Sequence, residues 1–212
     1  MPKGLTAKGA ATRTRVLAGA AELISHRGVA DTTLDDIRIA TGTSKSQLFH
    51  YFPGGKDQLL TEVARFQAER VLDTVRARMN PLTSWAAWRQ WRDQLLGEYD
   101  SLGAPCPLSV LINQLAPATP GARLVVASMV TQWRAHVRAG IEQMRATGAI
   151  RPELDPERGA AAVLAAVHGG AALMALTGSV DDLAAALDAA IDYLRCPPGP
   201  VPERVSSMQS CM

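Results

Sequence analysis

Apolar residues recur at helical spacing along almost the whole chain. The alternation of apolar and polar residues that is typical of strands is missing, while Ala, Leu, Arg and Gln, which favour helices, are common. We therefore expect an all-α fold of about nine helices. The expected segments are 12–27, 34–41, 44–52, 56–79, 85–99, 108–115, 119–146, 157–175 and 180–195.

Several of these segments begin with residues that are typical of helix N-termini. Thr33 precedes two aspartates, which suit the positive end of a helix dipole. Ser44 and Gln47 have the spacing of a capping box, in which each side chain bonds the backbone amide of the other. Asn80 and Pro81 form a further possible start, with Asn80 as the N-cap.

Charge is divided unevenly along the 212 residues. The whole chain carries a net charge of +2, but residues 1–56 contain eight basic and four acidic side chains, a net +4, and all of the lysines. This distribution suggests that the N-terminal part meets a polyanion. Taken alone, it is equally compatible with ordinary variation in composition.

The arrangement of the first three expected helices is the most informative feature. Two short helices joined by a tight turn at Gly42, with a longer helix in front, describe a helix-turn-helix. In that motif the second short helix enters the major groove of DNA. Polar and basic residues stand at the start of that helix and one turn later. They are Lys45, Ser46, Gln47, His50 and Tyr51, and Lys56 follows at the start of the next helix.

The segments 12–17 (TRTRVL), 20–23 (AAEL), 33–37 (TLDDI) and 42–60 (GTSKSQLFHYFPGGKDQLL) resemble the DNA-binding domain of the TetR family of repressors. The last segment is similar to the lincomycin-resistance-type (LmrA/YxaF-like) branch, and the later Cys106-Pro107-Leu108 is a weaker likeness to it. The resemblance implies an all-helical homodimer in which a larger C-terminal domain binds a small molecule and dimerises through its last two helices. Carried over by position, the DNA-facing residues are Thr33, Lys45, Ser46, Gln47, His50, Tyr51 and Lys56.

Two positions depart from the family pattern. Arg38 stands where a small Ala is usual, and Phe49 stands where Tyr is commoner, so a polar contact made there by relatives is lost. The DNA-facing residues also have structural alternatives: Thr33 is first of all a cap, and His50 and Tyr51 could pack against the first helix. Arg13 and Arg15 fit equally well as DNA contacts and as ordinary charges on a helix surface.

We expect three regions: a helix-turn-helix domain at 1–56, a ligand-binding and dimerisation domain at 57–196, and a disordered, Pro- and Ser-rich tail at 197–212. Aromatic residues are scarce, yet three tryptophans lie at three-residue spacing on the helix at 85–99. Core packing is their commoner role, but apolar cavities between helices also bind small ligands. The predicted ligand contacts are Trp88, Trp91, Met129, Trp133 and His168, the last with a hydrogen-bonded core histidine as its alternative.

The last two expected helices are rich in Ala and Gly, which allow helices to approach closely. They suit a four-helix bundle with a second subunit, although they could also bury each other within one chain. The cysteines Cys106, Cys196 and Cys211 lack metal-ligand spacing, so we expect no metal or cofactor. The start of the chain lacks the apolar core of a secretory signal, and no stretch suits a membrane span, so we expect a cytoplasmic protein.

Together these features predict a ligand-responsive transcriptional repressor that binds a palindromic operator in double-stranded DNA as a homodimer and is released by a small, mostly apolar effector. One alternative is a helical enzyme, in which Cys106 would need His136 or His168 beside it. Another is a ligand carrier or dimeric interaction module that has lost DNA binding, although the basic and polar set at Lys45–Lys56 argues against it.

Overall fold

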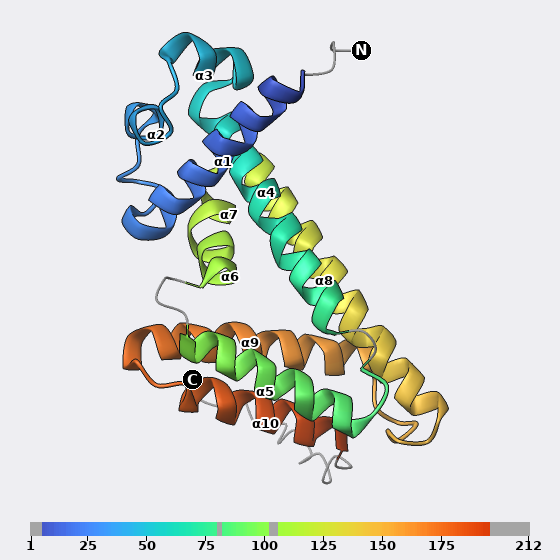
Figure 1. Ribbon diagram of the computed structural model, residues 1–212. Helices are drawn as coiled ribbons and strands as arrows, with labels where there is room; N and C mark the ends of the chain where they lie inside the picture. The colour runs from blue at the N-terminus through green and yellow to red at the C-terminus, as the bar shows by residue number, and fades with distance from the viewer. Residues whose placement is uncertain (1–5, 80–81, 102–105, 196–212) are drawn as a thin grey trace, which may run out of the picture.

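The computed structural model describes residues 6–79, 82–101 and 106–195 (Figure 1). All regular secondary structure in these ranges is helical, which confirms the all-α prediction. The helices are α1 Ala7–Arg27, α2 Leu34–Ala40, α3 Lys45–Tyr51, α4 Gly55–Arg78, α5 Trp85–Ser101, α6 Pro107–Val110, η1 Leu111–Leu115, α7 Ala116–Ala118, α8 Pro120–Ala146, α9 Pro156–Thr177 and α10 Asp181–Arg195.

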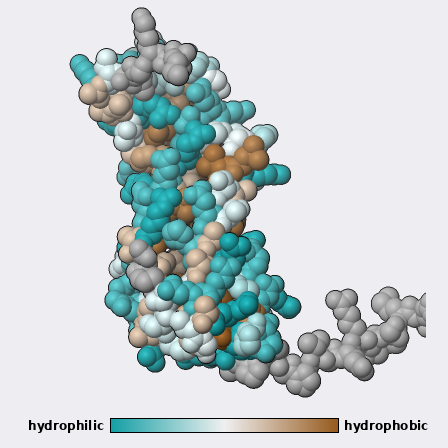
Figure 2. All heavy atoms as spheres, turned by 90° about the vertical axis from the view of Figure 1, so that its right-hand side faces the viewer, coloured by the Kyte–Doolittle hydropathy of each residue, from teal (hydrophilic) through white to brown (hydrophobic). Residues whose placement is uncertain are grey.

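The helices form two groups joined by a long helical pair (Figure 1). Helices α1, α2 and α3 lie together at one end, and α5, α9 and α10 form a layer at the other. The long helices α4 and α8 pack along each other and connect the two groups. The short segment from α6 to α7 lies between the groups, beside α4. Seen from the right-hand side of Figure 1, the surface is mainly hydrophilic, with small separate hydrophobic areas (Figure 2).

The predicted helix starts are confirmed where a side chain caps the helix. The hydroxyl of Ser44 accepts a hydrogen bond from the Gln47 amide at 3.2 Å, and Gln47 Oε1 accepts one from the Ser44 amide at 3.1 Å. Helix α1 begins five residues earlier than expected, because Thr6 caps it by accepting from the Gly9 amide. The expected cap at Asn80-Pro81 and the expected tail lie outside the described residues.

The segment at 108–115 was expected as one helix but is divided between α6 and η1, and the short helix α7 follows it directly. Helix α6 passes directly into η1, a π-helix that ends where the Ala116 amide bonds the carbonyl of Leu111. The chain then continues as the short helix α7, in which Pro117 has no amide hydrogen and so donates no backbone hydrogen bond. Counted as one interrupted element, this segment keeps the total in the described residues at the expected nine.

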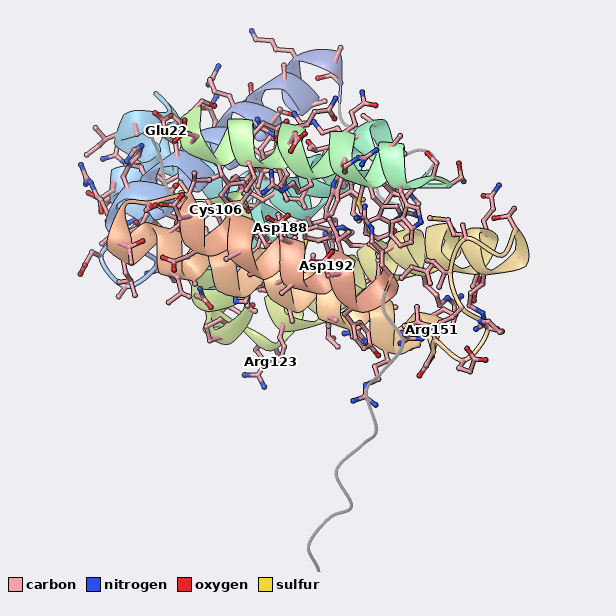
Figure 3. The ribbon with its side chains drawn as sticks, turned by 90° about the horizontal axis from the view of Figure 1, so that it is seen from below. Glu22, Cys106, Arg123, Arg151, Asp188 and Asp192 are labelled. Atoms are coloured by element: carbon pink, nitrogen blue, oxygen red, sulfur yellow. The ribbon has the colours of Figure 1, made fainter. Side chains whose placement is uncertain are left out.

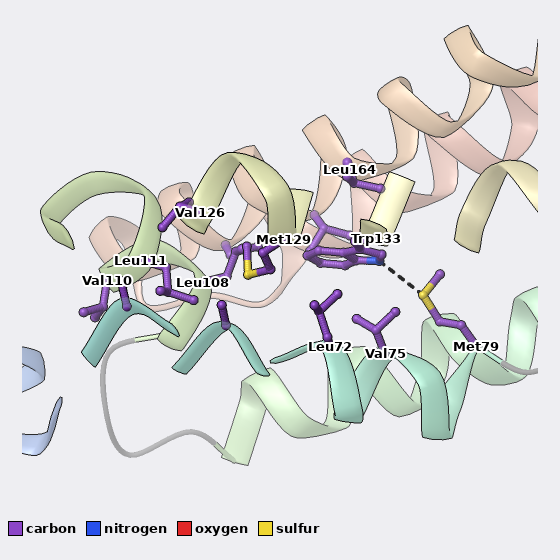
Figure 4. Packing of buried hydrophobic residues seen from close by; sticks show 14 of the residues in the cluster. Leu72, Val75, Met79, Leu108, Val110, Leu111, Val126, Met129, Trp133 and Leu164 are labelled. Atoms are coloured by element: carbon purple, nitrogen blue, oxygen red, sulfur yellow. Dashed lines mark hydrogen bonds between the residues drawn. The ribbon is translucent and has the colours of Figure 1, made fainter. Parts of the chain in front are cut away.

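Trp133 of α8 packs where the long helices α4 and α8 meet α9 (Figure 4). Its buried ring lies between Leu72 and Val75 of α4 on one side and Leu164 of α9 on the other. Helices α9 and α10 approach each other closely, because a Cβ on Gly170 would come within 2.6 Å of the Leu183 Cα. A larger residue at this position would therefore push the two helices apart.

Helix α9 is the most apolar helix of the described chain. Its length and composition would suit a membrane span, a test that the core helix of a water-soluble domain also passes. In this fold α9 packs against α8 and α10, yet only 33% of its most apolar 18-residue stretch is buried within the monomer. Part of its apolar surface is therefore exposed on the single chain.

Candidate DNA-binding surface and ligand cavity

Helix α3 is held in place by one buried side chain and by its C-cap. Leu48 is the buried residue of the helix, and Phe52, directly after it, is 1% exposed. Both belong to the hydrophobic core of the chain, which also contains Val16 of α1 and Ile37 of α2. Because one side of α3 is anchored in this way, the remaining side chains of the helix face outward.

The outward face of α3 brings together most of the predicted DNA-facing residues. Lys45, Ser46, Gln47 and His50 are exposed, whereas Tyr51 is half-buried with its ring edge-on to His50. Phe49 shares the exposed part of the helix and is 41% exposed, which is unusual for a large apolar side chain. The prediction of DNA contacts assigned Phe49 no role, although its apolar ring would suit the methyl group of thymine.

Gln47 has a structural role in addition to the predicted one. Its Oε1 already accepts from the Ser44 amide, so the side chain is fixed on the capping side of the helix. A carboxamide oxygen has two lone pairs, and its NH₂ group remains a donor. The fixed side chain therefore keeps one acceptor site and two donor hydrogens for a base edge.

Thr33 lies at the N-terminus of α2 and forms a complete capping box with Asp36. Hydrogen bonds from the Thr33 hydroxyl and amide hold the pKa of Asp36 below its usual range, and nearby Arg27 adds to this effect against a small opposing contribution from burial. The Thr33 side chain is exposed but already bonded, so a DNA phosphate would meet it only as an additional partner.

Lys56 is not free in this structure. Its Nζ donates to the carbonyl of Val29 across 3.1 Å, which ties the start of α4 to the connection between α1 and α2. Arg13 pairs with Glu62 at 2.8 Å, and Arg15 donates to the carbonyl of Thr41 at 3.1 Å. Arg15 therefore joins α1 to the end of α2, whereas Arg13 and Lys56 join α4 to the three-helix unit. A DNA role for Lys56 remains a prediction.

A cavity of about 270 Å³ lies between α4, α5, α6 and α8. Its walls are mainly apolar and aromatic, with polar groups on α4. The lining residues are Gln67, Arg70, Val71, Thr74, Val75, Arg78, Met79, Trp91, Leu95, Tyr99, Cys106, Pro107, Leu108 and Trp133.

Two of the five predicted ligand residues line this cavity, namely Trp91 and Trp133. Trp88 lies behind Trp91, fully buried, with the two rings edge-to-face at 5.8 Å. Met129 lines a different, shallower groove between α4 and α8, and half-buried His168 on α9 borders neither space. Of the five predicted ligand residues, the structure therefore brings only Trp91 and Trp133 together.

Sequence reasoning missed the residues that α4 contributes to the cavity. Arg70, Thr74 and Arg78 recur at helical spacing, but the sequence gives no sign that this face of α4 borders a cavity rather than solvent. The signal that could have been used is their position on the same helix as the buried Val75 and Met79. Apolar and basic side chains from neighbouring positions of α4 therefore border the same cavity.

Cys106 lies at the edge of the cavity beside Tyr99, with 2.9 Å between the sulfur and the phenol oxygen. Burial raises the pKa of the Tyr99 phenol far above its usual range, and Cys106 adds to this shift. The phenol is therefore protonated at neutral pH. Within the described residues the recorded partner of Cys106 is Tyr99, not His136 or His168. Among the residues that the structure describes, no group of three or more His, Cys, Asp or Glu is placed to hold a metal ion.

Helix α5 is fixed to α10, which carries Asp188 (Figure 3). The Nε and Nη2 groups of the Arg92 guanidinium donate to the two carboxylate oxygens of Asp188, with N–O distances of 2.9 and 2.8 Å, and this pairing raises the pKa of Arg92. The Arg195 guanidinium lies 4.6 Å from the centre of the Trp85 ring. These contacts hold one wall of the cavity against the layer formed by α9 and α10.

Two family models match this chain. Residues 16–63 match the model described as bacterial regulatory proteins, tetR family, and residues 85–190 match the tetracyclin repressor-like C-terminal domain. The second match alone spans half of the chain. The first contains α2 and α3 with all seven predicted DNA-facing residues, and the second contains Trp91, Cys106 and Trp133 of the cavity.

Individual relatives point the same way. An uncharacterized HTH-type transcriptional regulator, found in two strains of Mycobacterium tuberculosis, is 32% identical over 100 residues. That match covers 47% of this chain and 50% of the relative, so it spans about half the length of the curated relatives. Among solved structures, a TetR-family regulator from Cytophaga hutchinsonii has a TM-score of 0.77 at 17% identity and covers 91% of this chain and 99% of its own. A TetR regulator from Chloroflexus aurantiacus has a TM-score of 0.75 at 25% identity and covers 89% of this chain and 96% of its own.

Proposed function

Because the chain belongs to the TetR family of bacterial regulatory proteins, we propose that it is a ligand-responsive repressor that binds a palindromic operator as a homodimer. Proteins of this family are DNA-binding transcriptional regulators and not enzymes, and that description applies to this chain. Repression, the symmetry of the operator and the response to an effector go beyond family membership and form the proposal.

The observation that carries the proposal is the exposed face of α3. Lys45, Ser46 and Gln47 stand at the start of a helix that is anchored by Leu48 and capped by Ser44. In a helix-turn-helix these first residues meet base edges. The side chain of Lys45 suits guanine or phosphate, and the amide of Gln47 suits adenine.

The proposed dimer interface lies on α9 and α10. Four exposed positions on α9 lie three or four residues apart and form an apolar row, namely Ala165, Gly169, Leu173 and Leu176. Leu173 is 50% exposed and Leu176 is 85% exposed. A row of exposed apolar side chains on one helix face, unlike a single exposed leucine, is typical of an interaction surface. A two-fold partner would cover them and would place two α3 helices about 34 Å apart, the repeat of the major groove.

The proposed effector site is the cavity between α4, α5, α6 and α8. A route from the cavity to the DNA-binding unit begins at Leu108, which lines the cavity from α6. Helix α6 continues into η1, and Gln114 of η1 lies against Gly28, the C-cap of α1. A ligand that favours one position of α6 would therefore bias the position of α1 and lower DNA affinity by linkage.

The proposal assigns residues 1–56 to DNA binding and 57–196 to effector binding and dimerisation. Helix α4 belongs to both, since it starts beside the helix-turn-helix and ends at the cavity. The assignment to the LmrA/YxaF-like branch and the cytoplasmic location remain part of the proposal.

Two variants of Gln47 test the proposal in a gel-shift assay on the DNA upstream of the chain's own gene. Gln47→Ala removes both the base contact and the capping acceptor. Gln47→Glu keeps the acceptor of the capping box but replaces the amide donor by a negative charge. Both variants should lose specific binding while the oligomeric state is unchanged. Unaltered binding by Gln47→Glu would show that α3 does not read the operator in the proposed way.

A further inference from the structure

We propose that the effector is a small organic carboxylate with an apolar body, and that Arg70 binds its carboxylate at the mouth of the cavity. This inference rests on the proposed effector site and states the chemical class that the site selects. It is carried by three features of the lining: its size, its charge and its hydrogen-bonding groups.

The size and the walls of the cavity define the body of the ligand. A volume of about 270 Å³ corresponds to roughly nine waters at liquid density, which suits a molecule of on the order of ten non-hydrogen atoms. The inner walls consist of buried apolar side chains, namely Val75, Met79, Leu108, Trp91 and Trp133. Flat aromatic walls of this kind favour a ring or a short chain.

The charge of the lining favours an anion. Two arginines, Arg70 and Arg78, line the cavity, and none of the described lining residues is Asp or Glu. Arg78 is paired with Glu98. Arg70 is exposed, its guanidinium lies 5.6 Å from the centre of the Phe66 ring, and no acidic partner is recorded for it among the described residues. Arg70 therefore carries an unbalanced positive charge and a planar set of donors that match a carboxylate.

The hydrogen-bonding groups favour an acceptor on the ligand. The Nε1–H of Trp133 donates to the sulfur of Met79, which is a weak acceptor that a ligand oxygen would replace favourably. Thr74 and Gln67 add further donors on α4 beside Arg70. Tyr99 and Cys106 already form a hydrogen bond with each other, so neither needs a hydrogen-bonding partner on the ligand.

These features argue against the two other classes of small effector. Aromatic walls alone would suit a quaternary ammonium group, but the unbalanced charge of Arg70 at the mouth would repel a cation. A wholly apolar molecule would fill the inner walls and leave the Arg70 donors without a new partner. A carboxylate with an apolar body uses both parts of the cavity.

The test uses the full-length chain and three matched probes: trans-cinnamate, its neutral amide, and cinnamylamine as the cation. Binding is measured by titration calorimetry. We expect cinnamate to bind about tenfold or more tightly than the amide, because a charge-assisted bond is lost in the amide. We expect no binding of the amine. Equal affinity for acid and amide, a preference for the amine, or failure of all three probes to bind would each overturn the proposal.

Substitutions of Arg70 test which residue is responsible. Arg70→Gln should weaken cinnamate binding about tenfold and leave the affinity for the amide unchanged. Arg70→Lys, which keeps the charge but loses the planar donors, should lie between the two. Arg89→Gln, an exposed arginine of α5 outside the lining, is the control and should change neither affinity. Equal cinnamate affinities of Arg70→Gln and the unmodified chain would contradict the assignment.

Operator binding without any probe separates this inference from the proposed function. If the chain binds its operator but no probe binds, the effector class is wrong and the repressor proposal stands. If cinnamate binds in an Arg70-dependent way but specific DNA binding is absent, the site is supported and the repressor proposal fails.

Discussion

The indole Nε1–H of Trp133 donates to the sulfur of Met79 across 3.2 Å and so joins the middle of α8 to the end of α4 (Figure 4). Both residues line the cavity, and Met79 is the C-cap of α4. A ligand oxygen that takes the indole hydrogen would release the end of α4. The same helix begins beside the DNA-binding unit, so this contact lies on a second physical route between the two proposed sites.

Replacing Trp133 by Phe should remove most of the fluorescence change that accompanies ligand binding. The indole lines the cavity, so a bound ligand alters its surroundings directly. Trp85→Phe is the matched control, because the Trp85 ring lies under Arg195 and away from the cavity. The measurement is tryptophan emission during titration with cinnamate. An equal loss of signal in both variants would show that the change does not originate in the cavity.

Replacing Ser44 by Ala should destabilise the DNA-binding unit and weaken operator binding. The hydroxyl of Ser44 accepts from the Gln47 amide in the first turn of α3, and loss of such a cap costs about 1 kcal/mol. Ser46→Ala is the control for stability, since the recorded contact of the Ser46 hydroxyl is to the neighbouring Ser44 hydroxyl. Urea denaturation measures the difference. Equal stability of the two variants would show that the cap contributes nothing.

The stability of the chain should depend on the ionisation of Asp36. Hydrogen bonds from Thr33 lower the folded-state pKa of this carboxyl, so its contribution is fully present above the unfolded-state pKa, about 4. That contribution is lost as the pH falls through the folded-state pKa. Asp36→Asn should therefore be less stable than the unmodified chain at pH 6, and the difference should shrink towards pH 3. Urea denaturation at several pH values measures it, and a difference independent of pH would contradict the interpretation.

Replacing Leu173 by Glu should convert the proposed dimer into a monomer. A carboxylate on the exposed face of α9 would have to lose its water at a two-fold interface, where the same charge arrives from the partner. Leu124→Glu is the matched control, since Leu124 is 73% exposed but lies on α8. Sedimentation velocity measures the oligomeric state. If Leu173→Glu stays dimeric, or if Leu124→Glu alone dissociates, the interface lies elsewhere.

Local signals in the sequence predicted the helices well. The caps at Thr33 and Ser44 depend on residues three positions apart, and the structure contains both bonding patterns. The end of α1 at Gly28 and the start of α8 at Thr119-Pro120 are likewise local features. The early start of α1 was missed because the cap at Thr6 lies before the apolar pattern begins.

The cavity could be predicted only in part, because it depends on how four helices pack. The three-residue spacing of Trp88 and Trp91 put both on the same helix, but only packing decides which ring is buried and which borders a space. Arg70 looked like any charged residue on a helix surface. Its proposed role depends on the lining residues around it, none of which is acidic among those described. These residues come from helices that are far apart in the sequence.

The most direct test of the central claim is hydroxyl-radical footprinting of the DNA upstream of the chain's own gene. A homodimer that reads DNA through α3 should protect two related half-sites whose centres lie about one helical turn, 10–10.5 base pairs, apart, or a whole number of turns apart. The protection should disappear with Gln47→Glu and reduce steeply as salt is raised. Uniform protection without half-sites, or protection that Gln47→Glu leaves unchanged, would contradict the claim that this chain is an operator-specific regulator acting through α3.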